Sequence, residues 1–273
     1  MIIDGHAHAC GDFLKPNEII KRLDAQKVAK VVLVPGEWGS KKNYALPEMA
    51  LLFPSHNVVK ITNKLTKMVM KITGAIQQIP RGNDFVYELC QQTHGRVLQF
   101  VWITQGIENP LHYLDEKFKD WSFKGIKMHQ CWENFAIDSK FFKDIAAWAE
   151  EKELPLFIHL YGDKDVMEIM EYKRNHPKLR LIIAHLFGLE LFMFQKFKCK
   201  NLYFDTSTLQ LTSTKRLMKA LNYIGAEHIT LGSDTPYGRD NLRKNIERIQ
   251  GLPISKEEKE LILGENMKTL LKL

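Results

Sequence analysis

Residues 155–188 read PLFIHLYGDKDVMEIMEYKRNHPKLRLIIAHLFG, and this stretch contains the pattern that decides the fold. Two short apolar runs, 155–160 and 179–186, flank a segment, 163–175, that has the apolar spacing of a helix. Such alternation predicts a strand, a crossover helix and a second strand parallel to the first. The strand-helix-strand unit is therefore the repeat to seek in the rest of the chain.

Six further runs have the same short, β-rich character. The eight candidate strands span 1–8, 30–35, 96–104, 123–130, 155–160, 179–186, 201–206 and 228–234, and the helices expected between them include 17–27, 138–152, 163–175 and 212–223. Eight such units in about 250 residues are typical of a (β/α)8 TIM barrel. An open doubly wound sheet also alternates, but it seldom needs eight strands, and no glycine-rich turn follows the first one. We therefore predict a single barrel domain over residues 1–273.

Two segments lie outside the repeat. Residues 37–80 are too long for an ordinary strand-to-helix loop, so we expect an insertion after the second strand. At the other end, SKEE at 255–258 has the spacing of a capping box, which predicts a final helix to residue 273. We expect this helix to complete the outer layer of the barrel.

The insertion has an unusual charge pattern. Residues 49–83 contain no Asp or Glu and carry five cations: Lys60, Lys64, Lys67, Lys71 and Arg81. The lysines recur at spacings of four, three and four and leave an apolar face, which predicts a basic amphipathic helix. We interpret it as a lid over the barrel or a contact in a homo-oligomer, with a membrane-surface helix as the weaker alternative.

Polar side chains gather where the predicted strands end. Five of the ten histidines stand there, and a carboxylate ends the eighth strand: His6, His8, His129, His159, His185 and Asp234. In a TIM barrel the carboxyl ends of the strands form the active-site face, so side chains distant in sequence converge there.

His6 and His8 are separated by one residue on a strand, so both point to the same side. Two imidazoles can hold one ion, and neutral imidazole suits zinc, iron, nickel or cobalt. A carboxylate typically completes a catalytic site that keeps a position open for water. A solvated strand end is the alternative for an isolated pair, and the other strand-end histidines together with Asp234 argue against it.

The motifs IDGHAHACG at 3–11, PLFIHLYG at 155–162, LIIAHLFG at 181–188 and ITLGSDTPYG at 229–238 together resemble the amidohydrolase superfamily. The resemblance is specifically to amidohydrolase family 2, whose members are metal-dependent TIM-barrel hydrolases and decarboxylases. GIKMHQ at 125–130 and the sequence Gly264, Glu265 and Asn266 near the end look similar as well. The resemblance therefore covers nearly the whole chain.

The resemblance implies roles for these residues by position. His6, His8, His159 and Asp234 match the metal ligands, and a single Zn²⁺ ion is the expected cofactor. His185 would lie beside the ion and polarise the substrate or stabilise negative charge, while Asp234 would also take a proton from the water.

A two-ion arrangement is the alternative to this assignment. Lys127 would then be carboxylated and bridge the ions, and His185 would bind the second ion. We favour one ion, with Lys127 paired to a carboxylate of the barrel.

Two further residues are predicted to bind substrate. His129 lies two residues after Lys127 and faces the same way, and Arg239 follows Asp234 by five residues. Arg239 can hold a substrate carboxylate, although a surface pair with Asp240 or Glu247 explains it equally well. Among the tryptophans near strand ends, Trp38 and Trp132 are candidate pocket walls, and we assign Trp102 to barrel packing.

Composition and charge narrow the function classes. The chain is 45% hydrophobic and 26% charged, which argues against disorder, collagen and coiled coil. The net charge is +7, and five positive charges fall in 49–83, so the rest is close to neutral. No nucleic-acid reader motif accompanies the lysines, so nucleic acid is not an expected partner. Four scattered cysteines, no signal peptide and no membrane span lead us to expect a cytoplasmic protein.

The combined prediction is a metal-dependent hydrolase. An activated water would attack the carbonyl of an ester, lactone or amide in a small, anionic organic substrate. A non-oxidative decarboxylase with the same ligands is the first alternative. A TatD-like metal nuclease is the second, and Lys127 counts against it because that class usually has a glutamate on the fourth strand. A non-enzymatic binding protein is the last.

Overall fold

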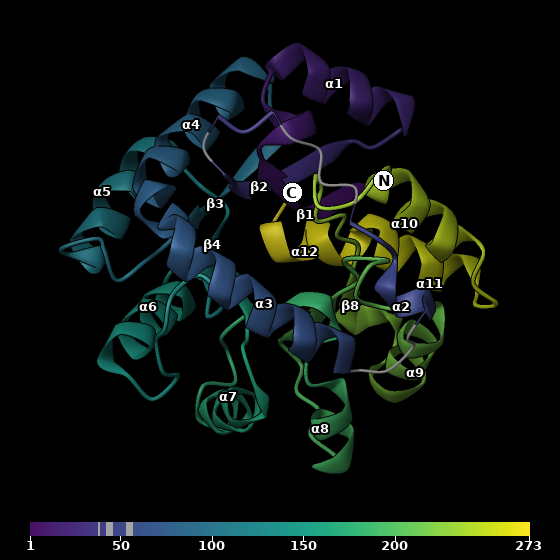
Figure 1. The fold of residues 1–273 in the computed structure, drawn as a ribbon. Helices are drawn as coiled ribbons and strands as arrows, with labels where there is room; N and C mark the ends of the chain where they lie inside the picture. The colour runs from purple at the N-terminus through teal and green to yellow at the C-terminus, as the bar shows by residue number, and fades with distance from the viewer. Residues whose placement is uncertain (38, 42–45, 53–56) are drawn as a thin grey trace.

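The computed structural model describes residues 1–37, 39–41, 46–52 and 57–273. Eight parallel strands form one sheet in the order of the chain (Figure 1). They are β1 (Ile3–Ala9), β2 (Lys30–Pro35), β3 (Val97–Trp102), β4 (Gly125–His129), β5 (Leu156–His159), β6 (Leu181–Ile183), β7 (Leu202–Asp205) and β8 (Ile229–Thr230). The predicted eight-stranded TIM barrel is confirmed.

The first and eighth strands meet and close the sheet. The Gly5 amide donates to the Leu231 carbonyl over 2.9 Å, and the His8 amide donates to the Thr235 carbonyl over 2.8 Å. Because a closed barrel buries both faces of each strand, the strands are continuous apolar runs with little polar alternation. The exceptions include Asp4 in β1 and Gln99 in β3, as well as the histidines near the carboxyl ends of β1, β4 and β5.

Helices follow the strands as the repeat predicts. The helices that connect successive strands are α1 (Pro16–Ala25), α4 (Ile79–Gln92), α5 (Pro110–Trp121), α6 (Lys140–Glu151), α7 (Asp163–Asn175), α8 (Leu189–Phe194) and α9 (Thr214–Ile224), and α10 (Asn241–Gln250) follows β8. Several begin with the expected caps: the side chain of Ser139 accepts the amide of Phe142, and that of Ser213 accepts the amide of Arg216.

The last segment folds differently from our expectation. It comprises α11 (Lys256–Glu260), a π-helical turn (Leu261–Glu265) and α12 (Asn266–Leu271). The Ser255 capping box is present. Met267 and Leu270 pack with Ile3 and Val32, which belong to the cluster inside the barrel. The end of the chain thus covers the amino-terminal end of the barrel, because its apolar side chains fill space that the strands leave open there.

The insertion contributes two helices, α2 (Met49–Leu52) and α3 (Asn57–Thr73), and a short 3-10 turn (Ala75–Gln78). Helix α3 crosses the carboxyl ends of the strands, which we call the barrel mouth (Figure 1). Among the described residues, no helix is long and apolar enough to cross a membrane.

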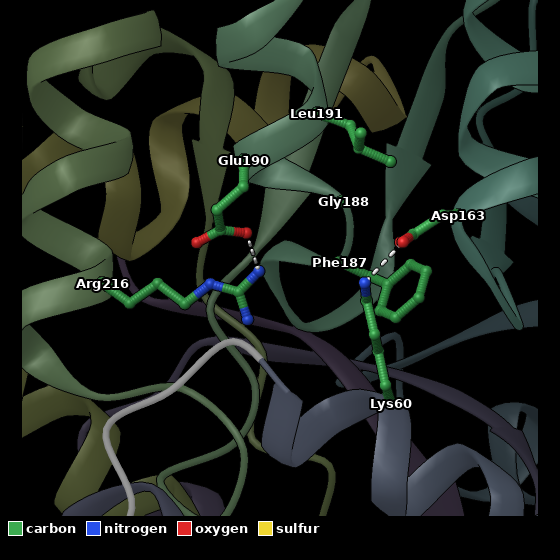
Figure 2. A pocket seen from close by; sticks show the side chains of 7 residues that line it. All are labelled: Lys60, Asp163, Phe187, Gly188, Glu190, Leu191 and Arg216. Carbon is green, nitrogen blue, oxygen red and sulfur yellow. Dashed lines mark hydrogen bonds and ion pairs between the residues drawn. The ribbon is translucent and has the colours of Figure 1, made fainter.

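Several side chains of α3 hold it against the barrel. Lys60 pairs with Asp163 at the start of α7, with 2.6 Å between Nζ and Oδ2. Figure 2 shows this pair on one side of a small hollow, across from the Arg216–Glu190 pair. Lys67 donates to Asn134 over 2.9 Å and lies 4.1 Å from the centre of the Tyr161 ring. Lys60 and Lys67, two of the four lysines of the predicted basic helix, therefore contact the barrel.

Candidate metal centre

Three of the four predicted metal ligands converge at the barrel mouth. His8 Nε2 lies 3.2 Å from Asp234 Oδ1, and His6 Nε2 lies 3.5 Å from the same oxygen. All three residues are buried, and their ligand atoms are mutually close enough to hold one ion. The spacing of two on β1 and the return of the chain after β8 produce this cluster.

The Nδ1 atoms of His6 and His8, which point away from Asp234, already have polar partners. His8 Nδ1 donates to the Pro35 carbonyl over 2.8 Å, which places its proton on that nitrogen. His6 Nδ1 lies 3.1 Å from Ser207 Oγ and 3.5 Å from Asp205 Oδ2. Such partners fix the tautomer and orient the ring for a metal.

The other imidazole nitrogens, Nε2 of His6 and Nε2 of His8, face the Asp234 carboxylate. Because its Nδ1 is engaged by the Pro35 carbonyl, His8 turns Nε2 towards the Asp234 carboxylate. Burial lowers the pKa of His6 well below its usual value. Burial would raise the pKa of Asp234, but the imidazoles of His6 and His8 outweigh it and bring the pKa to about 2. Two imidazole nitrogens and a carboxylate oxygen gathered around one point form a donor set that fits a divalent cation.

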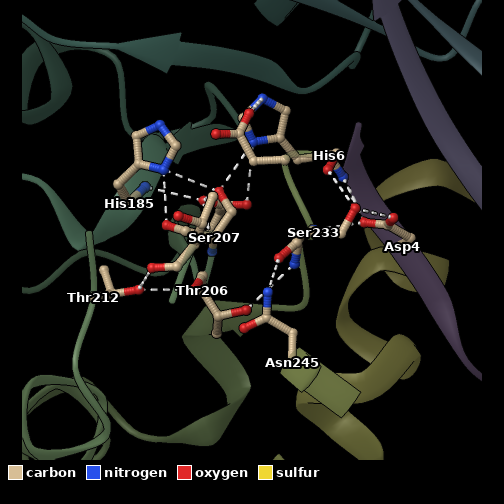
Figure 3. A network of polar contacts seen from close by, with 12 residues as sticks. Asp4, His6, His185, Thr206, Ser207, Thr212, Ser233 and Asn245 are labelled. Carbon is tan, nitrogen blue, oxygen red and sulfur yellow. Dashed lines mark hydrogen bonds and ion pairs between the residues drawn. The ribbon is translucent and has the colours of Figure 1, made fainter. Parts of the chain in front are cut away.

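Ser207 lies between His6 and His185, as Figure 3 shows, and Asp205 contacts the same group of residues. Ser207 Oγ donates to Asp205 Oδ1 over 2.5 Å, and the His185 amide donates to the same oxygen over 3.0 Å. His185 Nδ1 donates to the Ser207 carbonyl over 2.7 Å. The ring of His185 is therefore held with its other nitrogen available for the cavity that it lines.

His185 and Asp234 share a rare backbone conformation. Their φ angles are 57° and 52°, in the left-handed region that costs a residue with a Cβ about 1–3 kcal/mol. His185 lies two residues after β6, and Asp234 lies four residues after β8. Eight other described non-glycine residues also have a positive φ, so this conformation alone does not distinguish His185 and Asp234.

Lys127 lies against the same cluster. Its Nζ is 3.2 Å from His6 Nε2, and burial lowers its pKa to about 8. The ammonium group also lies 4.2 Å from the centre of the Phe157 ring. The two-ion alternative with a carboxylated Lys127 stays a prediction.

His159 lies beside the cluster and has other partners. Its Nε2 donates to Asn63 Oδ1 on α3 over 2.8 Å, and its ring stacks on His129 with 3.9 Å between centres and 18° between planes. His159 groups with His129 and Cys131 by distance. Because an imidazole binds an ion in the plane of its ring, this face-to-face stacking does not direct the two rings at one common ion. In this arrangement His159 contacts the insertion.

The centre opens into a cavity of about 730 Å³ between the strand ends and the insertion. The described residues that line it include His129 and Trp132, as predicted, along with the metal-site residues, Lys127 and His185. Trp102 is fully buried in the barrel. Arg239 is exposed and is not among the lining residues, so its substrate role stays a prediction. Trp38 lies outside the described residues.

Sequence reasoning missed Asn63 and the Asp205–Ser207 pair. Asp205 had a signal, because it is the carboxylate next to the end of the seventh predicted strand, 201–206, much as Asp234 ends the eighth. No comparable signal marked Asn63, which in the sequence is only an amide residue on the apolar face of a predicted helix.

A family model described as amidohydrolase matches residues 68–273, and the chain belongs to that family, amidohydrolase family 2. The resemblance inferred from the motifs is thereby confirmed. Among curated proteins, no significant match is found.

Solved structures with the same fold include three enzymes. One is the 2,6-dihydroxybenzoate decarboxylase from Rhizobium, with TM-score 0.69, 16% identity, and coverage of 99% of this chain and 98% of that one. Another is the 4-oxalomesaconate hydratase from Rhodopseudomonas palustris, with TM-score 0.67, 14% identity, and coverage of 100% and 96%. The third is a dihydroxybenzoic acid decarboxylase from a Polaromonas species, solved with manganese and 2-nitroresorcinol, with TM-score 0.69, 14% identity, and coverage of 100% and 97%.

Proposed function

We propose that this protein is a metal-dependent hydrolase that cleaves a C–N or C–O bond next to a carbonyl group. The observation that carries the proposal is the cluster of His6 Nε2, His8 Nε2 and Asp234 Oδ1, because it brings two imidazole nitrogens and a carboxylate oxygen together around one point. His6, His8 and Asp234 would hold one divalent ion, with Zn²⁺ as its identity. His159 would join them once its Nε2 leaves Asn63.

When bound, such an ion supplies Lewis acidity that polarises a carbonyl and lowers the pKa of water. Asp234 remains ionised near neutral pH and can accept the proton of the attacking water. His185 lines the cavity with its Nδ1 proton committed to Ser207, so its Nε2 can face the substrate. In protonated form it would stabilise the developing oxyanion.

Decarboxylation is the second candidate. The cavity walls are largely apolar, and a carboxylate held there loses hydration that its neutral product, carbon dioxide, does not need. Two of the similar solved structures are also described as decarboxylases. The same histidines and Asp234 would then hold the ion that binds the acid, and the carbon would take up a proton as carbon dioxide leaves.

The metal content and the reaction products test this proposal. Purified protein should hold about one divalent ion per chain. His8→Ala should lose most of that metal and at least a thousandfold of the activity, whereas His112→Ala, which removes an exposed histidine, should lose neither. Reactions in ¹⁸O-labelled water separate the candidates, because hydrolysis transfers the label to a product and decarboxylation releases carbon dioxide from the substrate. Full activity without metal would overturn both.

A further inference from the structure

The insertion forms most of the apolar wall above the metal centre. Of the 24 described residues that line the cavity, twelve come from 37–80. Eight of these are aliphatic, proline or methionine side chains: Leu46, Pro47, Met49, Val58, Ile61, Leu65, Val69 and Met70. The remainder of the barrel supplies the polar floor at the strand ends. The cavity therefore has two chemically distinct parts, which must contact different parts of a ligand.

Helix α3 presents its apolar side to the cavity. Val58, Ile61, Leu65 and Val69 follow one another at spacings of three, four and four, which places them on one face. The four lysines of the helix are absent from the described lining residues. The charge that made the insertion unusual in sequence thus lies away from the ligand space.

Ionisable groups of the cavity concentrate on the floor. Among the described lining residues, Lys127 is the sole lysine or arginine, and it is buried against His6. Glu37 is the sole acidic residue that the insertion adds to the wall. An anionic group placed along α3 would lose hydration without gaining a cationic partner, which is strongly unfavourable.

We propose that the ligand has one polar reacting head and an uncharged, largely apolar body, and that the α3 face of Val58, Ile61, Leu65 and Val69 binds this body. The assignment of the head to the metal centre rests on the proposed function, whereas the binding of the body rests on the wall alone. A volume of about 730 Å³ is within the range of sites that enclose drug-sized molecules. The insertion is then a specificity element as well as a cover.

Straight-chain carboxylates from butanoate to decanoate serve as probes, with binding measured by calorimetry on the full chain. Affinity should rise about fourfold for each added methylene, the value for burial of a CH₂ group. Octanedioate, which carries a second charge at its far end, should bind at least tenfold more weakly than octanoate. Equal affinity for these two, or no dependence on length, would overturn the proposal.

A pair of variants on α3 locates the effect. Leu65 and Met68 are 55% and 57% exposed, but only Leu65 lines the cavity. Leu65→Asp should weaken octanoate binding at least tenfold, and Leu65→Ala should weaken it by a smaller factor. Met68→Asp should stay within twofold of the unchanged protein. An equal loss in Leu65→Asp and Met68→Asp would refute a role for this face.

Metal removal separates this proposal from the proposed function. The dependence on chain length should persist in protein treated with chelator, because it comes from α3. A uniform loss of affinity across the series, restored by Zn²⁺, would report the head at the metal centre. If metal removal leaves the affinities unchanged while affinity still rises with chain length, the proposed metal function is wrong and the apolar site stands. If metal removal lowers the affinities but affinity does not depend on chain length, the apolar site alone is wrong.

Discussion

Asn63 fastens α3 to the barrel mouth, and Asn63→Ala should loosen the helix. Its side chain is 1% exposed. Its Nδ2 donates to the Leu160 and Tyr161 carbonyls, each over 3.0 Å, and its Oδ1 accepts from His159 Nε2 over 2.8 Å. The variant removes all three hydrogen bonds and leaves their partners at a buried interface.

The size of the effect follows from these contacts. Three hydrogen bonds at about 1 kcal/mol each amount to about 3 kcal/mol. Alanine recovers about 0.6 kcal/mol through its higher helix propensity. The net loss for docking of α3 is therefore roughly 2–3 kcal/mol.

Hydrogen exchange measured by mass spectrometry tests this value. A loss of 2–3 kcal/mol should speed exchange across residues 57–73 roughly 30- to 150-fold, since about 1.4 kcal/mol is a factor of ten. Exchange in the strands should change little, because they do not depend on α3. Lys64→Ala is the matched control, since the neighbouring Lys64 is exposed on the same helix. An acceleration below about threefold, or an equal one in the control, would refute the reasoning.

Three other predictions concern packing, pH and metal. Gly125→Ala should lower the free energy of unfolding by about 1–3 kcal/mol, because a Cβ there would lie 2.6 Å from the Phe100 ring. Gly106→Ala is the control in denaturant titrations, because the atom nearest to its Cβ would be Thr104 Oγ1 at 3.7 Å, an ordinary contact. Burial raises the pKa of Glu133 from 4.5 to about 7, so the folded state holds its proton more tightly. The resulting contribution to the free energy of unfolding is complete below pH 4.5 and is lost as pH rises through 7, by roughly 1–2 kcal/mol. Glu133→Gln should remove this pH dependence from unfolding curves recorded at several pH values. Zn²⁺ at about 100 times its Kd should stabilise the chain by about 2.7 kcal/mol in thermal unfolding, with no shift in His8→Ala.

The strands and the first metal ligands could be predicted because they depend on local periodicity. A run of apolar residues makes a buried parallel strand wherever it occurs, and a spacing of two on a strand aligns His6 with His8. The position of Asp234 followed from the barrel rule that strand ends meet. The insertion was recognised from its length, and its basic helix from the lysine spacing.

The partners of individual side chains could not be predicted in this way. His159 ends its strand as expected, yet its Nε2 contacts Asn63, which is 96 residues away in the chain. The final helix has the expected cap, yet its apolar residues enter the barrel end. The lysine spacing predicted a basic face on α3, whereas the contacts of Lys60 and Lys67 with the barrel were not predictable from it.

The amino-acid sequence by itself therefore determined the barrel, the family and the strand-end residues, since each depends on patterns within a few neighbouring positions. Only the tertiary structure decided how α3 docks, which of its faces meets the cavity, and how the two sides of each imidazole are engaged. These features depend on the packing of segments that lie far apart in the chain, and the periodicity of a single segment does not specify which surface it will meet.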